Sequence, residues 1–327
     1  MTLRRSLTPW LAGFAVTFCV SCIDTLDSAW FTNEAVDAYH WPHNEVPKDH
    51  IEEVQLLGDT LEDDQGAPTL HGVWLHPCAD DRPQDCPASS EFEPANRNKT
   101  LLYFHGQDKH LGAHWDRLQI LWRMGYRVFA IDYRGYGRST GQPSEAGLYA
   151  DGRTALRHVL SRIAEERGID LEEGELPRAD ILGVAYYGRS LGTTVAVDVA
   201  TEFNPAALVL ESPLASAQGF VDSAAGIGVS ASVLMTSRFD NVSKLPFVIA
   251  PKLIMHGQED DYVRFDFAEL LFELATEPKE FFAVAGAGHG GVPCPDRDES
   301  VDAEEVPCVA NSAYLEQVHS FFDQYLP

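Results

Sequence analysis

The sequence predicts an α/β fold in which helices cover both faces of a mostly parallel central sheet. Two observations favour this class. From about residue 46 onward, short apolar runs alternate with longer amphipathic segments, which is the pattern of strands connected by crossover helices. The chain also has 327 residues, 45% of them hydrophobic, enough for one large domain with a sizeable core. We therefore expect a single domain over residues 46–327.

The expected elements follow from the period of the apolar residues. Short aliphatic and aromatic runs predict strands at residues 53–57, 70–75, 100–104, 126–131, 181–186, 207–210, 252–255 and 280–284. Apolar residues at helical spacing predict helices at residues 111–124, 149–167, 191–201, 265–274 and 311–325. Residues 214–250 interrupt the alternation just before one of the last two strands. We interpret them as a short insertion that forms a small lid.

The most specific motif is Gly-Arg-Ser-Leu-Gly at residues 188–192, which joins an expected strand to an expected helix. Gly188 and Gly192 allow strand and helix to pack closely around a sharp turn that exposes Ser190. The turn strains the backbone and places the serine at a helix N-terminus, where negative charge is favoured. We therefore predict that Ser190 is the nucleophile of a nucleophile elbow.

Two residues downstream are candidates to activate this serine. A serine hydroxyl needs a general base, and the base needs an orienting acid. Asp260 and His289 each follow an expected strand, and the order serine, acid, histidine is typical of the α/β-hydrolase fold. Asp260 fits the HGxxDxxV spacing of that fold, although Glu259 and Asp261 are neighbours that could be mistaken for it. Glycines flanking His289 allow its loop to approach Ser190.

The oxyanion of an acyl-transfer intermediate needs backbone N–H donors. Leu191, directly after the nucleophile, is one expected donor. The loop after the strand at 100–104 should supply the other, with Gln107 preferred over Gly106. We interpret His105 and His256, which precede the oxyanion and acid loops, as structural residues packed beneath them.

A longer segment carries a family resemblance. Residues 132–152 begin Asp-Tyr-Arg-Gly-Tyr-Gly-Arg-Ser-Thr-Gly and follow an expected strand. With the motifs above, they resemble the membrane-associated α/β-hydrolase-domain proteins, a group that includes protein depalmitoylases and many bacterial esterase-like proteins. The resemblance covers roughly residues 65–327 and implies that Arg134, Tyr136 and Arg138 shape the loop near the site. Their ordinary role would be to hold that loop by hydrogen bonds and packing.

The chemistry expected from these residues is hydrolysis of a carboxylic ester or thioester through an acyl-enzyme on Ser190. The expected substrate is a small or acylated molecule, and the reaction requires no cofactor and no metal. A peptidase or amidase could use the same triad, but we identify no added domain or charged anchors for an extended peptide. A non-catalytic surface binding protein on a retained hydrolase scaffold is the other alternative, and the intact order of the three residues argues against it.

The N-terminus has the layout of an export signal. Residues 1–21 contain two arginines and then an apolar stretch too short to span a bilayer comfortably, as in a secretory signal peptide. The end of the stretch, Cys-Val-Ser-Cys, resembles a bacterial lipobox, with Cys19 where leucine is usual. We therefore expect an acylated Cys22 in a membrane-anchored bacterial lipoprotein, with residues 22–45 as a tether. A secreted protein and an uncleaved anchor are the alternatives.

The other four cysteines flank two loops, Cys78 with Cys86 and Cys294 with Cys308. Local pairing within each loop is the favoured one of three connectivities, and disulfides persist in oxidising compartments. These loops depart from the family pattern and argue against an intracellular depalmitoylase role.

The charge balance limits the possible partners. The chain has 24 Lys+Arg against 50 Asp+Glu, for a net charge of −26. Such a surface repels nucleic acid and anionic membrane surfaces and keeps the protein soluble.

Overall fold

The computed structural model describes residues 30–62, 64–77, 96, 98–172, 175–225, 236–297 and 306–327. Several predictions fall outside these residues: the signal peptide, the acylated Cys22, the pairing of Cys78 with Cys86, and the middle of the expected lid. Within the described part, no helix is both long enough and apolar enough to cross a bilayer.

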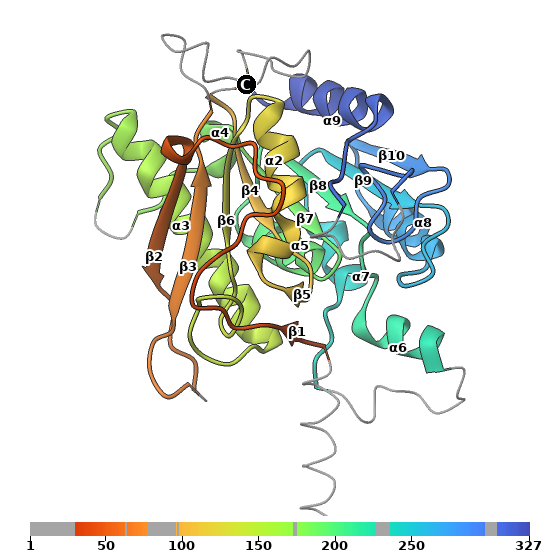
Figure 1. Ribbon diagram of the computed structural model, residues 1–327, viewed down its shortest axis with the longest axis horizontal. Coiled ribbons are helices and arrows are strands. Elements are labelled where there is room, and N and C mark those ends of the chain that lie inside the picture. The colour runs from red at the N-terminus through yellow and green to blue at the C-terminus, as the bar shows by residue number, and fades with distance from the viewer. Residues whose placement is uncertain are drawn as a thin grey trace, which may run out of the picture.

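An eight-stranded sheet forms the centre of the molecule, in the order β10-β9-β8-β7-β4-β6-β3-β2 (Figure 1). Its strands are β2 (Ile51–Leu57), β3 (Thr69–Leu75), β4 (Thr100–Phe104), β6 (Arg127–Ile131), β7 (Val184–Arg189), β8 (Ala207–Glu211), β9 (Lys252–Gly257) and β10 (Lys279–Val284). All neighbours from β10 to β6 are parallel, and β3 is antiparallel to both β6 and β2. The predicted mostly parallel sheet is confirmed.

Helices cover both faces of this sheet, as predicted. One face carries α3 (Glu145–Glu166), α5 (Gly192–Glu202) and α8 (Phe265–Leu274), and the other carries α2 (Trp115–Arg123) and α9 (Ser312–Tyr325). Each face of the sheet has its own hydrophobic core. Alternate residues of one strand pack in the two cores, because successive side chains point to opposite faces. In β4, Leu102 and Phe104 pack in the first core, and Leu101 and Tyr103 pack in the second.

Several expected boundaries were wrong, and two of them have clear local reasons. The strand expected at 181–186 begins only at Val184, because Ala179–Leu182 forms the short helix α4. That helix ends at Gly183, whose φ of 73° lies in the left-handed region that glycine enters without strain. Helix α3 starts earlier than expected because the Ser144 side chain accepts a hydrogen bond from a first-turn N–H and caps it.

The tether expected at residues 22–45 was also wrong from Trp30 onward. We call residues 30–41 the strap, because they lie against the domain and form strand β1 (Thr32–Asn33), which pairs in parallel with β5 (Asp108–Lys109). Aromatic residues fasten the strap, since Trp41 stacks on Trp115 with ring centroids 4.1 Å apart. Burying such large rings stabilises the packed segment, whereas in a solvated tether the rings would stay exposed to water. The folded domain therefore begins before residue 46.

The insertion between β8 and β9 contains three short elements in its described parts. These are α6 (Ala217–Ala225), α7 (Asn241–Lys244) and the 3₁₀ turn η6 (Leu245–Phe247). Elsewhere in the chain, the 3₁₀ turn η1 (Lys48–His50) precedes β2, and the 3₁₀ turn η4 (Leu111–His114) precedes α2. The two described ends of the insertion are joined, because Asn241 donates its side-chain N–H to the Leu214 carbonyl at 2.8 Å.

Candidate active site

Ser190 lies at the turn between β7 and α5. Its φ of 52° is in the left-handed region, which costs free energy for a residue with a side chain. A Cβ on Gly188 would lie 2.7 Å from the Gly192 carbonyl oxygen, and one on Gly192 would lie 2.1 Å from that of Phe104. Neither contact is tolerable, so both glycines are required for the strand and helix to approach as the elbow demands.

The structure brings the three predicted residues together. The Ser190 hydroxyl lies 3.0 Å from Nε2 of His289, and Nδ1 of His289 lies 2.8 Å from Oδ2 of Asp260. With Nδ1 donating to the carboxylate, Nε2 is free to accept the serine proton. Ser190 is 3% exposed, so the hydroxyl sits in a largely dehydrated site where electrostatic interactions are strong.

Asp260 is held by a set of donors that its neighbours lack. Its Oδ1 accepts the backbone N–H groups of Tyr262 and Val263, at 3.0 and 2.8 Å. Nε2 of His256 lies 3.0 Å from Oδ2. Burial acts to raise the pKa of Asp260, but the hydrogen bonds from His256 and His289 outweigh it and hold that pKa well below its usual range. The carboxylate is therefore ionised at every pH at which the protein would work.

The competing carboxylates are excluded by position. Glu259 and Asp261 are exposed, whereas Asp260 is buried beside His289. His256, expected to be structural, contributes more than packing because it contacts the Asp260 carboxylate directly. Its place four residues before Asp260 is the sequence signal from which this contact could have been inferred.

His289 is suited to act as a base. Burial lowers its pKa, and the hydrogen bond and charge of Asp260 act in the opposite direction, leaving a net lowering. The imidazole is therefore neutral around pH 7, which is the form that accepts a proton. The ring of Tyr262 packs against it, with centroids 5.0 Å apart.

The loop after β4 passes directly beside the nucleophile. A Cβ on Gly106 would lie 3.4 Å from the Cβ of Ser190. Gln107, the next residue, accepts a hydrogen bond at its carbonyl from the Thr32 hydroxyl at 3.0 Å. Leu191, the other predicted donor, is buried and precedes the first turn of α5. Both predicted oxyanion donors thus belong to segments that adjoin Ser190.

His105 lies under this loop, where it was expected to pack. It is fully buried, its Nδ1 donates to the Gly106 carbonyl at 2.6 Å, and its ring lies 4.3 Å from that of Tyr133. Burial lowers the pKa of His105 to about 3. A histidine that stays neutral and bonds its own loop supports that loop rather than acting as a base.

The three residues that the family resemblance singled out hold their loop. Arg134 is buried and donates to Asp151 at 2.8 Å and to Asp64 at 2.8 Å. Arg138 pairs with a carboxylate of β2, and Tyr136 packs with its ring 5.3 Å from that of His105. Hydrogen bonding and packing are therefore the roles that these contacts support.

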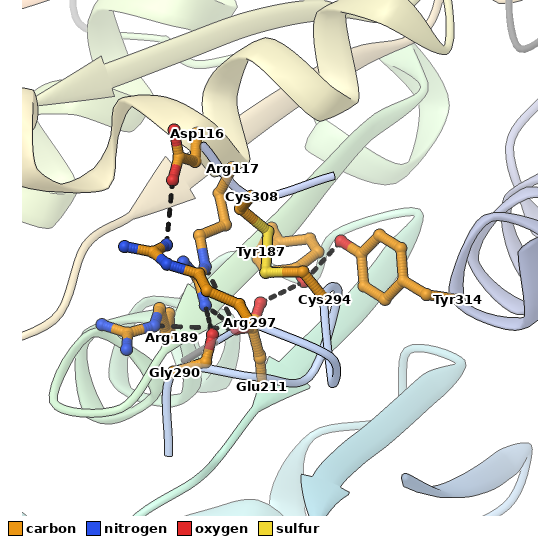
Figure 2. The surroundings of a disulfide bond; sticks show 10 residues. All are labelled: Asp116, Arg117, Tyr187, Arg189, Glu211, Gly290, Cys294, Arg297, Cys308 and Tyr314. Atoms are coloured by element: carbon orange, nitrogen blue, oxygen red, sulfur yellow. Dashed lines mark hydrogen bonds and ion pairs between the residues drawn. A yellow bond between two sulfur atoms is a disulfide. The ribbon is translucent and has the colours of Figure 1, made fainter. Parts of the chain in front are cut away.

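A buried polar cluster, which sequence reasoning missed, adjoins the Ser190 turn through the backbone of Glu211. Figure 2 shows its side chains. We call it the Glu211 cluster; its members are Arg117, Tyr187, Arg189, Glu211 and Tyr314. Glu211 accepts hydrogen bonds from Arg117 at 3.2 Å and from the Tyr187 hydroxyl at 2.5 Å, and Arg189 lies 3.6 Å away. Its backbone carbonyl accepts the N–H of Ser190 at 2.9 Å. The cluster therefore connects directly to the nucleophile turn.

The same cluster reaches the histidine loop. Arg117 donates to the carbonyl of Gly290, the residue after His289. Further along the loop, Cys294 and Cys308 form a disulfide, which is the local pairing predicted for this loop. The loop that carries His289 is thus tied to α2 by the buried guanidinium of Arg117 and is closed on itself by a covalent link. In the part of the chain that the structure describes, no cluster of His, Cys, Asp or Glu is arranged to hold a metal.

The sequence is similar to one family model and to proteins described as alpha/beta hydrolase domain-containing. A family model described as "Serine aminopeptidase, S33" matches residues 95–239. Alpha/beta hydrolase domain-containing protein aho-3 of Caenorhabditis elegans is 33% identical over 236 residues, which are 70% of this chain and 58% of that protein. Human alpha/beta hydrolase domain-containing protein 17B is 34% identical over 200 residues, 60% of this chain and 62% of that protein. The match spans less than two thirds of either relative.

Solved structures show the same fold at low identity. An esterase of Pyrococcus furiosus superposes with a TM-score of 0.57 at 17% identity, over 90% of this chain and 100% of that one. An alpha-beta hydrolase of Vibrio vulnificus gives 0.55 at 18% identity, over 97% and 95%. The sheet and its helices therefore form the α/β-hydrolase fold.

Proposed function

We propose that this chain, which has the α/β-hydrolase fold, is a serine hydrolase that cleaves a carboxylic ester or thioester of a small or acylated molecule. The observation that carries the proposal is a chain of two hydrogen bonds. Oγ of Ser190 lies 3.0 Å from Nε2 of His289, and Nδ1 of His289 lies 2.8 Å from Oδ2 of Asp260. A hydroxyl, a neutral imidazole and a carboxylate in this order are the groups that acyl transfer to serine needs.

The reaction proceeds in two steps. Nε2 of His289 takes the proton of Ser190 as Oγ attacks the substrate carbonyl carbon. The imidazolium then donates that proton to the leaving alkoxide or thiolate. In the second step a water attacks the acyl-enzyme and gives its proton to the same nitrogen, which returns it to Ser190 as the acid product leaves. Asp260 stays ionised throughout and stabilises the imidazolium.

The N–H groups of Leu191 and Gln107 are the proposed donors to the oxyanion. Each such donor stabilises the transition state by about 2.7–4 kcal/mol in a comparable hydrolase. The N-terminus of α5 adds a partial positive charge at the same place, because the helix begins at Gly192, two residues after Ser190.

An aminopeptidase is the second candidate, favoured by the description of the matching family model. The same three residues could cleave an amide, provided that His289 protonates the departing amine. Comparing p-nitrophenyl esters with aminoacyl p-nitroanilides separates the two proposals, because an aminopeptidase must turn over the anilides, whereas an ester hydrolase should turn over only the esters.

The first test labels the purified protein with a fluorophosphonate and measures turnover of p-nitrophenyl esters of increasing chain length. We expect Ser190→Ala to lose both labelling and turnover. Ser243→Ala, which removes an exposed hydroxyl in α7, is the matched control and should retain both. A folded wild type that takes no label would overturn the triad and favour the binding-protein alternative.

We also propose that the protein is exported as a lipoprotein acylated on Cys22, with a secreted form as the alternative. The signal-like residues 1–21 and the Cys294–Cys308 disulfide, a bond typical of oxidising compartments, support export. Labelling of cells with a palmitate analogue, followed by fractionation, tests it. Cys22→Ala should lose the label and the membrane association; an unlabelled wild type released into the medium would instead indicate the secreted form.

A further inference from the structure

Gln107 is held from two sides by residues far from it in sequence. On one side, the Thr32 hydroxyl of β1 donates to the Gln107 carbonyl at 3.0 Å. On the other, the Gln107 side-chain amide donates to the hydroxyl of Tyr262, two residues after Asp260. Its carbonyl and its side chain therefore each have a fixed partner, and the rotation of its backbone is restricted.

The contact with Thr32 belongs to a continuous backbone pairing. Strand β1 runs parallel to β5, with Thr32 opposite Asp108 and Asn33 opposite Lys109. The N–H of Glu34 donates to the Lys109 carbonyl at 3.0 Å. The chain immediately after Gln107 is therefore fixed to the strap, so the Thr32 hydroxyl acts on a segment that is already aligned with it.

The strap itself is firmly attached at both ends. At one end Trp30 is buried, with its ring 5.3 Å from Phe220 and 5.7 Å from Phe239. At the other end the Tyr39 hydroxyl donates to the buried carboxylate of Asp132. Because these anchors lie outside the oxyanion loop, β1 can position Gln107 rather than move with it.

Tyr262 is placed to connect two parts of the site. Its backbone N–H donates to Asp260 at 3.0 Å, its ring lies 5.0 Å from that of His289, and its hydroxyl accepts from Gln107. The ring is 43% exposed and lies 5.2 Å from that of Phe220 in α6. It therefore spans from the acid loop, across the base, to the oxyanion loop.

We propose that Thr32 and Tyr262 are positioning residues that clamp Gln107 and hold its N–H at the oxyanion site. This proposal rests on the proposed function, because it assigns Gln107 a role in that reaction. A donor gives its full stabilisation only when it is aligned before the charge develops, so a clamp that removes backbone freedom acts on the transition state. Thr32 then supports the active site from a segment that precedes the rest of the domain.

The test compares kcat and KM for p-nitrophenyl esters in Thr32→Val and Tyr262→Phe, which keep shape and remove one hydroxyl each. Complete loss of an oxyanion donor costs about 10²–10³ in kcat, so loss of one clamp should cost less, roughly threefold to tenfold, with KM unchanged. Thr32→Ser should restore wild-type kcat. The double variant should fall at least as far as the product of the single losses, because Gln107 is then held by neither residue.

Asn33→Ala is the matched control for the strap. Asn33 neighbours Thr32 and also donates to a backbone carbonyl, at 2.6 Å, but that carbonyl belongs to Gly135 in another loop. Asn33→Ala should therefore leave kcat unchanged. Unchanged kcat in both hydroxyl variants, a rise in KM alone, or an equal loss in Asn33→Ala would each overturn the clamp. An inactive, unlabelled wild type would instead refute the proposed function, so the two failures are distinguishable.

Discussion

Replacing Glu211 by glutamine tests how much the buried cluster behind the site stabilises the fold. Glu211 is the only carboxylate among the cluster's five residues, and it faces two guanidinium groups. Arg117 and Arg189 are both nearly buried, with side chains 4% and 12% exposed. Glutamine keeps the size and one acceptor oxygen but removes the charge. Both guanidinium groups would then lie in the protein interior without a carboxylate partner.

The expected loss is about 3–5 kcal/mol of unfolding free energy, the cost of removing one partner of a buried ion pair. This is a large part of the ~5–15 kcal/mol that typical proteins have in total. Urea denaturation monitored by circular dichroism measures the loss, with Glu53→Gln as the control. Glu53 pairs with Arg138 at the surface, where such a pair contributes about 0–1 kcal/mol. Stability of Glu211→Gln within ~1 kcal/mol of wild type would refute the reasoning.

Three further outcomes are expected. Because burial lowers the pKa of His289, the imidazole stays neutral to more acidic pH, so kcat/KM should fall on the acidic side with a midpoint below 6.5; a midpoint at or above that value contradicts the geometry. Gly192→Ala should abolish labelling by fluorophosphonate, since its Cβ would lie 2.1 Å from the Phe104 carbonyl oxygen, and retained labelling would show that the elbow can relax. Cys294→Ser with Cys308→Ser should lower unfolding free energy by about 2–4 kcal/mol in thermal or urea unfolding, and no change would show that the loop is held without the bond.

That Ser190, Asp260 and His289 lie together could be predicted from the sequence, because their positions depend on local patterns and on one topological rule. A parallel sheet brings the carboxyl ends of its strands to one edge, so residues that follow successive strands meet there. Ser190, Asp260 and His289 each follow such a strand, and the structure brings them within hydrogen-bond distance. Choosing Asp260 over Glu259 and Asp261 needed only the spacing after β9.

The strap could not be predicted because its partners are not local. Thr32 bonds to a residue 75 positions away, and a two-residue strand has too few residues to show any period. The aromatic residues of the strap were visible, but without a period they indicated nothing about where they pack. The alternation of strands and helices therefore placed the start of the domain at residue 46, beyond the segment that contacts the loop after β4.

The Glu211 cluster was missed for a different reason. Charged residues are almost never fully buried unless they are paired, and a single sequence does not show which distant residue makes the pair. Arg117 lies in an amphipathic helix and Glu211 ends a strand, so each has the local pattern of a residue at the surface. Only the ion pair between them explains why both side chains are buried.

The loops of the site are thus held by segments that contain none of the catalytic residues. The strap fixes the oxyanion loop through Thr32, His256 fixes the acid, and Arg117 fixes the loop that follows the base. Catalysis by a preorganised site requires that its dipoles be in place before the charge develops, and loops alone do not provide that rigidity. The Thr32 support is separate from the other two, so its loss should misplace Gln107 and leave the other groups aligned. A substitution at Thr32 therefore reports on the alignment of one group, whereas one at Arg117 would disturb both the Glu211 cluster behind Ser190 and the loop after His289.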